Sequence, residues 1–154
     1  MSIKNKLNLI TLIVVSFALV IISLTISKAM TQSAFMSQAK ELNVLSQKLS
    51  LLIHETQKER GASAGFLGSQ GQKFADKLPQ QRVLTTQMNS ELNDYLSTLD
   101  LNDFPSELQS ELSSFTSDMD KIDSIRSQIS SLSVSVKDEV SYYTNMNAKI
   151  LNIV

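Results

Sequence analysis

The sequence predicts an all-α protein in which an N-terminal transmembrane helix continues into an antiparallel four-helix bundle. The 154-residue chain contains only two prolines and four glycines, a composition that favours long helices over a sheet. Its first 27 residues carry two lysines and no acidic side chain, and every acidic residue lies at position 41 or later. Beyond this apolar start, hydrophobic residues recur at the spacing of about 3.6 that amphipathic helices require.

The predicted transmembrane helix covers residues 7–27. This stretch carries no charged side chain and consists mostly of Leu, Ile and Val, and about 20 such residues span a bilayer core of about 30 Å. Lys4 and Lys6 precede it. Because positive residues favour the cytoplasmic side, we expect residues 1–6 in the cytoplasm and residues 28–154 outside it, with the chain anchored in the inner (cytoplasmic) membrane.

A cleaved signal peptide is the alternative interpretation of this apolar stretch. Ser27 and Ala29 are small residues at the spacing of a cleavage site. However, the apolar run is longer than the roughly 7–15 residues of a signal peptide, and Lys28 lies between the two small residues. The retained anchor is therefore the preferred prediction.

The first two helices of the bundle are predicted on either side of a glycine-containing stop signal. Residues 32–67 carry apolar side chains on one helix face, and no helix breaker separates them from the membrane segment. The stop signal is Gly68–Gly71. A second apolar stripe covers residues 72–99 and contains Pro79, where we expect the helix to start or to kink.

The third and fourth helices are predicted from a proline turn and a capping signal. Ser106 or Asp103, on either side of Pro105, is expected to cap the third helix. Ser135 and Asp138 have the spacing of a capping box at the start of the fourth helix. Four helices joined by short turns favour an antiparallel bundle. The fourth helix reaches the end of the sequence without a capping residue, so we expect the domain to be incomplete there.

Charge and composition exclude several classes of function. The net charge is −1 and no basic run is present, so no nucleic-acid partner is expected. The sequence has no cysteine, and His54 is its one histidine, so thiol and histidine-based metal sites are not expected. Asp118, Asp120 and Asp123 lack the glycine and the spaced acid of a calcium loop. Without a nucleophile–base pair or a cofactor motif, we expect neither an enzyme nor a cofactor.

Arg60 is the candidate ligand-binding residue. It lies 18 residues after Leu42, about five helical turns, so the two side chains point the same way and Arg60 is expected on the apolar stripe. A core-facing guanidinium needs a partner or an anion, and its planar fork suits a planar oxyanion. Gln57 and Ser63, about one turn away on either side, can add hydrogen bonds. Arg126 also falls on an apolar stripe and joins the predicted anion site.

Five small residues follow Arg60 in an otherwise helical pattern, from Gly61 to Gly65. Glycine inside a helix costs about 1 kcal/mol relative to alanine. Close approach of another helix would offset this cost, so we expect Gly61, Ala64 and Gly65 to pack closely against a neighbouring helix.

A purely structural role for the two arginines is the alternative. Each would then pair with a carboxylate on a neighbouring helix, and Asp120 or Glu91 would serve Arg126. Both interpretations fit the residues, and the structural one is the commoner use of such an arginine.

The segment Gln57–Leu67 resembles the signature of the nitrate- and nitrite-sensing (NIT) domain. Ile122–Arg126 and Val140–Thr144 resemble later parts of that domain, and the likeness covers about residues 45–154. The resemblance implies an all-helical sensor with nitrate or nitrite as ligand and Arg60 as the contacting arginine. Members of the family carry a second half with another Glu-Arg motif, which this sequence lacks, so we expect an incomplete pocket.

Two functions follow from these observations. The first is the extracytoplasmic sensor region of a bacterial transmembrane signalling receptor, with a chemoreceptor favoured by the membrane helix, that binds a small anion such as nitrate or nitrite. The second is a membrane-anchored helical-bundle module that recognises a protein partner and no small molecule, with Arg60 fully salt-bridged. A homodimer is expected in either case.

Overall fold

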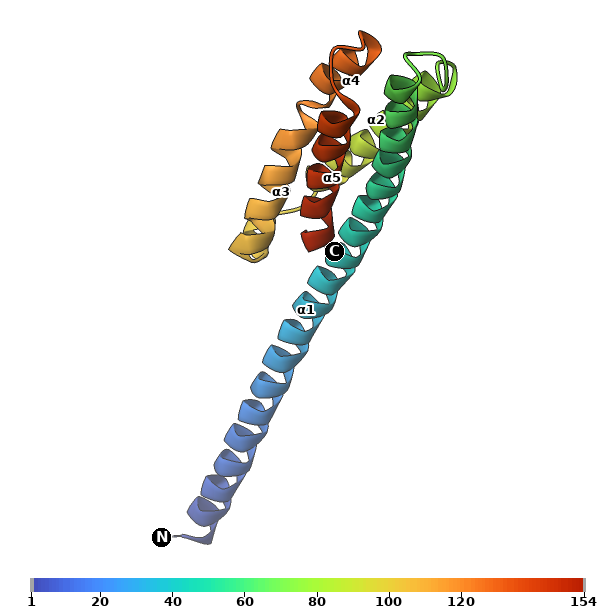
Figure 1. The fold of residues 1–154 in the computed structure, drawn as a ribbon. Helices are drawn as coiled ribbons and strands as arrows, with labels where there is room; N and C mark the ends of the chain where they lie inside the picture. The colour runs from blue at the N-terminus through green and yellow to red at the C-terminus, as the bar shows by residue number, and fades with distance from the viewer. Residues whose placement is uncertain (1, 154) are drawn as a thin grey trace. The chain divides into compact units, whose positions relative to one another are not determined.

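The computed structural model describes residues 2–153, with Leu9 and Ala34 described by their backbone alone. No strand is present among these residues, so the all-α prediction is confirmed. The chain divides into two compact units, Met1–Leu42 and Asn43–Val154. The elements in chain order (Figure 1) are α1 (Ile3–Gly68), α2 (Lys77–Leu96), the short 3-10 helix η1 (Leu101–Asp103), α3 (Ser106–Met119), α4 (Ile122–Ser130) and α5 (Val136–Ile153).

The first unit consists of the N-terminal part of α1. It contains an 18-residue window with a mean hydropathy of 2.9, none of which is buried in the structure. The threonine hydroxyls in this part donate to backbone carbonyls four residues earlier, at 2.8–3.0 Å for Thr11, Thr25 and Thr31. These hydroxyls are therefore satisfied within the helix, as an apolar surrounding requires. By its length and composition, the segment could cross a bilayer core.

The second unit is a bundle in which α1, α2, the α3–α4 pair and α5 alternate in direction (Figure 1). Side-chain contacts between helices fix these directions, because residues later in one helix pair with residues earlier in the next. The contacts are Lys48–Glu91 and Glu55–Gln81 between α1 and α2, Arg82–Ser130 and Thr86–Arg126 between α2 and α4, and Thr56–Asn147 and Arg60–Thr144 between α1 and α5.

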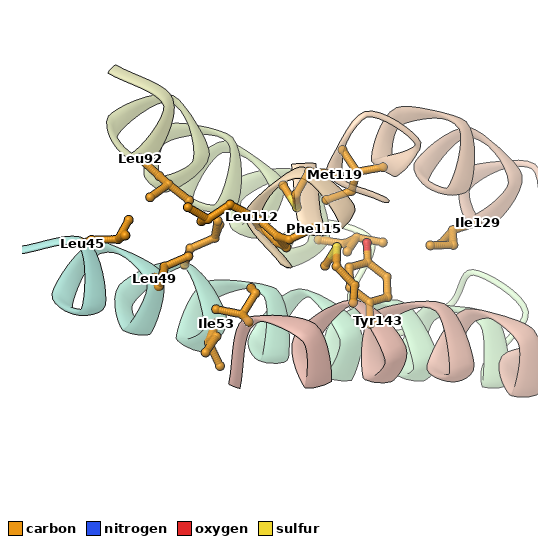
Figure 2. Packing of buried hydrophobic residues seen from close by; sticks show 14 of the residues in the cluster. Leu45, Leu49, Ile53, Leu92, Leu112, Phe115, Met119, Ile129 and Tyr143 are labelled. Carbon is orange, nitrogen blue, oxygen red and sulfur yellow. The ribbon is translucent and has the colours of Figure 1, made fainter. Parts of the chain in front are cut away.

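The hydrophobic core joins all the helices of the bundle. Figure 2 shows side chains of α1, α2, α3, α4 and α5 meeting in one interior, with Leu49, Phe115 and Tyr143 among them. These three side chains are each at most 1% exposed. Burial of one large apolar side chain contributes about 1.5–3 kcal/mol, so the core is the main force that holds the bundle together.

The predicted helix limits are largely confirmed. α1 ends at Gly68, as the stop signal indicates, and Pro79 lies in the first turn of α2, where its missing N–H is harmless. A helix start, and not a kink, is therefore the outcome at Pro79. The Ser135 hydroxyl accepts from the Asp138 backbone N–H at 3.1 Å and donates to the Asp138 carboxylate at 2.7 Å, which confirms the capping signal before α5.

The third predicted helix is divided into α3 and α4, which is a correction. At the junction the Lys121 backbone N–H bonds to the carbonyl of Asp118, three residues back, at 3.1 Å. The four-residue ladder of an α-helix is interrupted there. The start of α3 also differs from expectation, because Pro105 occupies the capping position and no side chain bonds the exposed amides.

Candidate functional site

The core-facing side of α1 changes from apolar to polar in its last third. Thr56, Glu59 and Ser63 are each 0% exposed and continue the stripe that begins with the buried leucines of α1. On α5, buried polar or hydroxyl-bearing side chains occur at every fourth position and face this stripe. We call the six residues together the polar seam: Thr56, Glu59, Ser63, Glu139, Tyr143 and Asn147.

Glu59 is the most strongly bound residue of the polar seam. Arg126 donates from Nε to Oε1 at 2.7 Å and from Nη2 to Oε2 at 2.8 Å, and the Tyr143 hydroxyl donates to Oε1 at 2.8 Å. The Arg82 Nε lies 3.9 Å from Oε1. Two parallel bonds from one guanidinium form the strongest common pairing of a carboxylate, so Glu59 is held firmly in the core by Arg126.

The pKa values around Glu59 reflect this arrangement. Burial alone lowers the pKa of Arg126, but the hydrogen bonds and charge of Glu59 outweigh burial and raise it. Burial raises the pKa of Tyr143, and the adjacent negative charge of Glu59 raises it further. Arg126 therefore stays a cation and Tyr143 a hydrogen-bond donor at all physiological pH values.

Arg126 and Arg82 join three helices. Besides Glu59, Arg126 donates to the Thr86 hydroxyl at 3.0 Å, to Asp123 at 3.2 Å and to the Arg82 carbonyl at 3.2 Å. Arg82 donates to the Ser130 hydroxyl at 2.9 Å and to the Arg126 carbonyl at 3.1 Å. The predicted carboxylate partner of Arg126 is Asp120 or Glu91, but its main partner in the structure is Glu59. Its donors are occupied, so the structural interpretation fits this arginine.

Arg60 differs from these two arginines. Its side chain is half-buried and donates from Nη1 to the Thr144 hydroxyl at 3.1 Å. Among residues 2–153, no carboxylate forms an ion pair with it. A guanidinium has five N–H donors, so most of those on Arg60 are open to a ligand.

The position of Arg60 on the helix corrects the expectation from spacing. Leu42, the residue that defined its face, is itself 38% exposed, whereas the neighbouring Glu59 is fully buried. Leu42 and Arg60 are five helical turns apart and point the same way, but Leu42 itself lies outside the core. Arg60 therefore lies at the edge of the polar seam, and Glu59 occupies the core-facing position.

Among residues 2–153, the polar seam also contains two buried groups without hydrogen-bond partners, one turn from Glu59 on α1 and one turn from Tyr143 on α5. Ser63 Oγ and both carboxyl oxygens of Glu139 are buried without a hydrogen-bond partner in the described part of the chain. Burial raises the pKa of Glu139 to about 7; the charge of Arg60 opposes this rise, and the charge of Glu59 adds to it. Ser63 follows Glu59 by four residues and Glu139 precedes Tyr143 by four, so the antiparallel register places them at the same level.

The remaining predicted residues lie as follows. Gln57 is exposed one turn before Arg60. A Cβ atom added at Gly61 would meet no described atom within 4 Å, so no helix among residues 2–153 packs closely against it, contrary to expectation. At Gly65 the close neighbour is the Phe74 ring from the following loop, not another helix. Ala64 is half-buried. Within the described residues, no group of three or more metal-binding side chains is present.

Sequence reasoning missed Glu59, Tyr143, Glu139 and Asn147. Their positions in the sequence do carry a signal, because they recur at helical spacing. Glu59 lies three residues after Thr56, and the α5 residues recur every four, so each set occupies one helix face. Periodicity measured on apolar residues alone does not detect a core position that holds a carboxylate.

Comparisons with known proteins agree with this architecture. The structure of the NasR transcription antiterminator has a similar fold, with a TM-score of 0.71 at 20% sequence identity over 74% of this chain. The similar region is 31% of that chain, so the present chain spans less than a third of its length. No match was found among curated proteins. The family model described as nitrate and nitrite sensing matches residues 51–154, more than half of the sequence, and the chain therefore belongs to the NIT family.

Proposed function

We propose that this chain is the extracytoplasmic sensor region of a bacterial transmembrane receptor, and that it binds nitrate or nitrite at Arg60. Family membership supports the class of ligand. The observation that carries the proposal is the state of Arg60, which is half-buried and bonded to the Thr144 hydroxyl, with no ion-pair partner among the described residues. A planar guanidinium with open donors matches a planar oxyanion.

The neighbouring groups have different roles in this proposal. Ser63 would contribute its buried hydroxyl, which lacks a partner among the described residues, and exposed Gln57 would contribute its amide from one turn earlier. Arg126 acts indirectly, because its donors are bound to Glu59 and the adjacent helices. It holds Glu59, and thereby the helix that presents Arg60. The function is binding and not catalysis.

The membrane segment supports a receptor. α1 includes both the apolar window and Arg60, and the lysines before that window favour a cytoplasmic N-terminus. For signalling, the ligand must bind one arrangement of the helices more tightly than another. A displacement of α1 on binding would then be transmitted to the membrane segment, and a chemoreceptor is the output class we favour.

We also propose that the chain forms a homodimer. The open surroundings of Gly61 leave a small residue on the surface of α1, where the backbone of a second copy could approach. Exposed apolar side chains on the bundle, among them Leu51 and Val83, add to the surface available for pairing. Chemical cross-linking in detergent micelles tests this proposal, and a purely monomeric chain at all concentrations would contradict it.

The protein-partner alternative predicts a different environment for Arg60. It requires an arginine fully paired with a carboxylate from a neighbouring helix. The hydrogen bond to the neutral Thr144 hydroxyl does not favour that alternative.

Thermal unfolding of the full chain in detergent micelles tests nitrate binding. Saturating sodium nitrate, at about 100 times the dissociation constant, should stabilise the fold by about 2.7 kcal/mol and raise the melting temperature. Arg60→Ala should abolish the rise. Lys58→Ala is the matched control, since it removes the same charge from an exposed neighbour on α1, and sodium chloride controls for ionic strength. No rise, or an equal rise in Arg60→Ala, would refute the proposal.

A further inference from the structure

Glu139 is a buried carboxyl group that the bundle leaves without hydrogen bonds. It is 0% exposed, and neither of its oxygens has a partner among the described residues, in contrast to Glu59 with its three bonds. Ser63 Oγ is buried and lacks a partner in the same way. Buried polar groups are almost always bonded, and an exception requires an explanation such as an absent ligand. Two such groups at one level of the polar seam indicate a place where a ligand group belongs.

The charges that act on Glu139 come from α1, and the other titratable groups nearby are bound to Glu59. On α1, Arg60 attracts its negative form and Glu59 repels it. On α5, Tyr143 lies one turn further along, and its hydroxyl donates a hydrogen bond to Glu59. On α4, Arg126 is bound to Glu59, so Arg60 is the cation available to Glu139. An ionised Glu139 and a bound anion would therefore compete for the same guanidinium.

We propose that Glu139 is a further binding residue of the anion site, and that it admits the anion only when its carboxyl group carries a proton. This inference rests on the function proposed above. In the neutral form Glu139 donates its O–H to an oxyanion held by Arg60, and Ser63 donates its hydroxyl from the opposite helix. In the ionised form the carboxylate repels the anion and attracts the positive charge of Arg60. One proton is taken up with each anion when the empty site is ionised.

The direction of the pH dependence follows from the pKa of Glu139, which burial raises to about 7. Below this value the proton is already in place, so the affinity for nitrate changes little. Above it the proton must be taken from solvent, so the affinity falls about tenfold for each pH unit. Nitrate itself stays an anion throughout this range, so the ligand does not cause the change.

Isothermal titration of sodium nitrate into the full chain in detergent micelles tests the inference. Between about pH 6 and about pH 8.5 the dissociation constant should rise about 30-fold, as expected for a single site with a pKa near 7. At the higher pH, titration in two buffers with different ionisation enthalpies should show uptake of about one proton per nitrate.

Two variants assign this effect to Glu139. Glu139→Gln keeps a hydrogen-bond donor and loses the titration, so it should bind nitrate with the same affinity at both pH values and without proton uptake. Glu107→Gln is the matched control, because it removes an exposed acid from the first turn of α3 and should behave like the wild type.

The outcomes separate the two proposals. Binding that Arg60→Ala abolishes but that is equally strong at both pH values overturns the role of Glu139 and leaves the anion site intact. Persistent proton uptake in Glu139→Gln overturns it as well. If the wild-type chain binds no nitrate at either pH, the proposed function fails and the inference fails with it. The proton count on the wild type decides the question even if Glu139→Gln does not fold.

Discussion

Removal of Arg126 should destabilise the bundle more than any other single change to a charged residue that we consider. Glu59 is fully buried, and Arg126 supplies two of its three hydrogen bonds, at 2.7 and 2.8 Å. In Arg126→Met the carboxylate would keep only the Tyr143 hydroxyl and the more distant Arg82. Loss of one partner of a buried ion pair costs about 3–5 kcal/mol, because the other charge stays in the core uncompensated.

The assay is thermal unfolding of the full chain in detergent micelles, followed by the near-ultraviolet signal of its tyrosines. For a bundle of about 110 residues, 1 kcal/mol corresponds to about 3–5 °C. Arg126→Met should therefore lower the melting temperature by at least about 10 °C. Lys121→Met is the matched control, since Lys121 pairs with Asp118 on the surface at 3.0 Å with its side chain 62% exposed. A surface pair of this kind contributes about 0–1 kcal/mol.

The double variant Glu59→Leu with Arg126→Met completes the test. Apolar replacement of both partners removes the uncompensated charge and is often neutral or stabilising, so it should recover most of the loss. A melting temperature of Arg126→Met within about 3 °C of the wild type would refute the assignment of Glu59 as a buried, ionised partner.

Four further predictions concern other parts of the bundle. The pKa of Glu139 is raised from its ordinary value of 4.5 to about 7, so the folded state binds more protons, and the stability it contributes below pH 4.5 should be lost as pH rises through 7. Between about pH 4.5 and about pH 8, the free energy of unfolding of the wild type, measured with denaturant, should fall by about 3 kcal/mol relative to that of Glu139→Gln. Gly61→Ala should stabilise α1 of the monomeric chain by up to about 1 kcal/mol, since no described atom of the same copy lies within 4 Å of the added Cβ. Gly65→Ala should gain less in the same assay, because its Cβ would displace the Phe74 ring. Ser135→Ala should cost about 0.5–2 kcal/mol through loss of the α5 cap, measured by urea unfolding.

Most of the fold could be predicted from local patterns. The stop at Gly68 and the cap at Ser135 each depend on residue types with a strong conformational preference, and the structure agrees with both helix limits. The apolar segment lies within α1. The break between α3 and α4 could not be predicted in this way. No glycine or proline marks it, and the apolar stripe passes through Asp120 and Lys121 without a change of phase.

The candidate site could be predicted only in part. A resemblance in the segment around Arg60 directed attention to the helix turn that contains the buried Glu59, but hydrophobic periodicity assigned the core position to the wrong neighbour. Successive residues of a helix diverge by about 100°, so Glu59 and Arg60 cannot both face the interior. The partners of Glu59 lie on α4 and α5, 67 and 84 residues later in the sequence, and no local pattern indicates such distant pairs.

In the proposed site, Glu59 has the structural role and its neighbour Arg60 the ligand-binding role. Glu59 is held from α4 and α5 by directional bonds, which fix the rotation of α1 about its axis and therefore the direction of Arg60. Apolar packing in Glu59→Leu with Arg126→Met can restore stability, but it is less directional and fixes this rotation less well. We therefore expect that double variant to melt near the wild-type temperature and yet to bind nitrate at least about tenfold more weakly, a difference of about 1.4 kcal/mol. Titration calorimetry measures the affinity, and wild-type affinity in a stable double variant would show that the ion pair does not position Arg60.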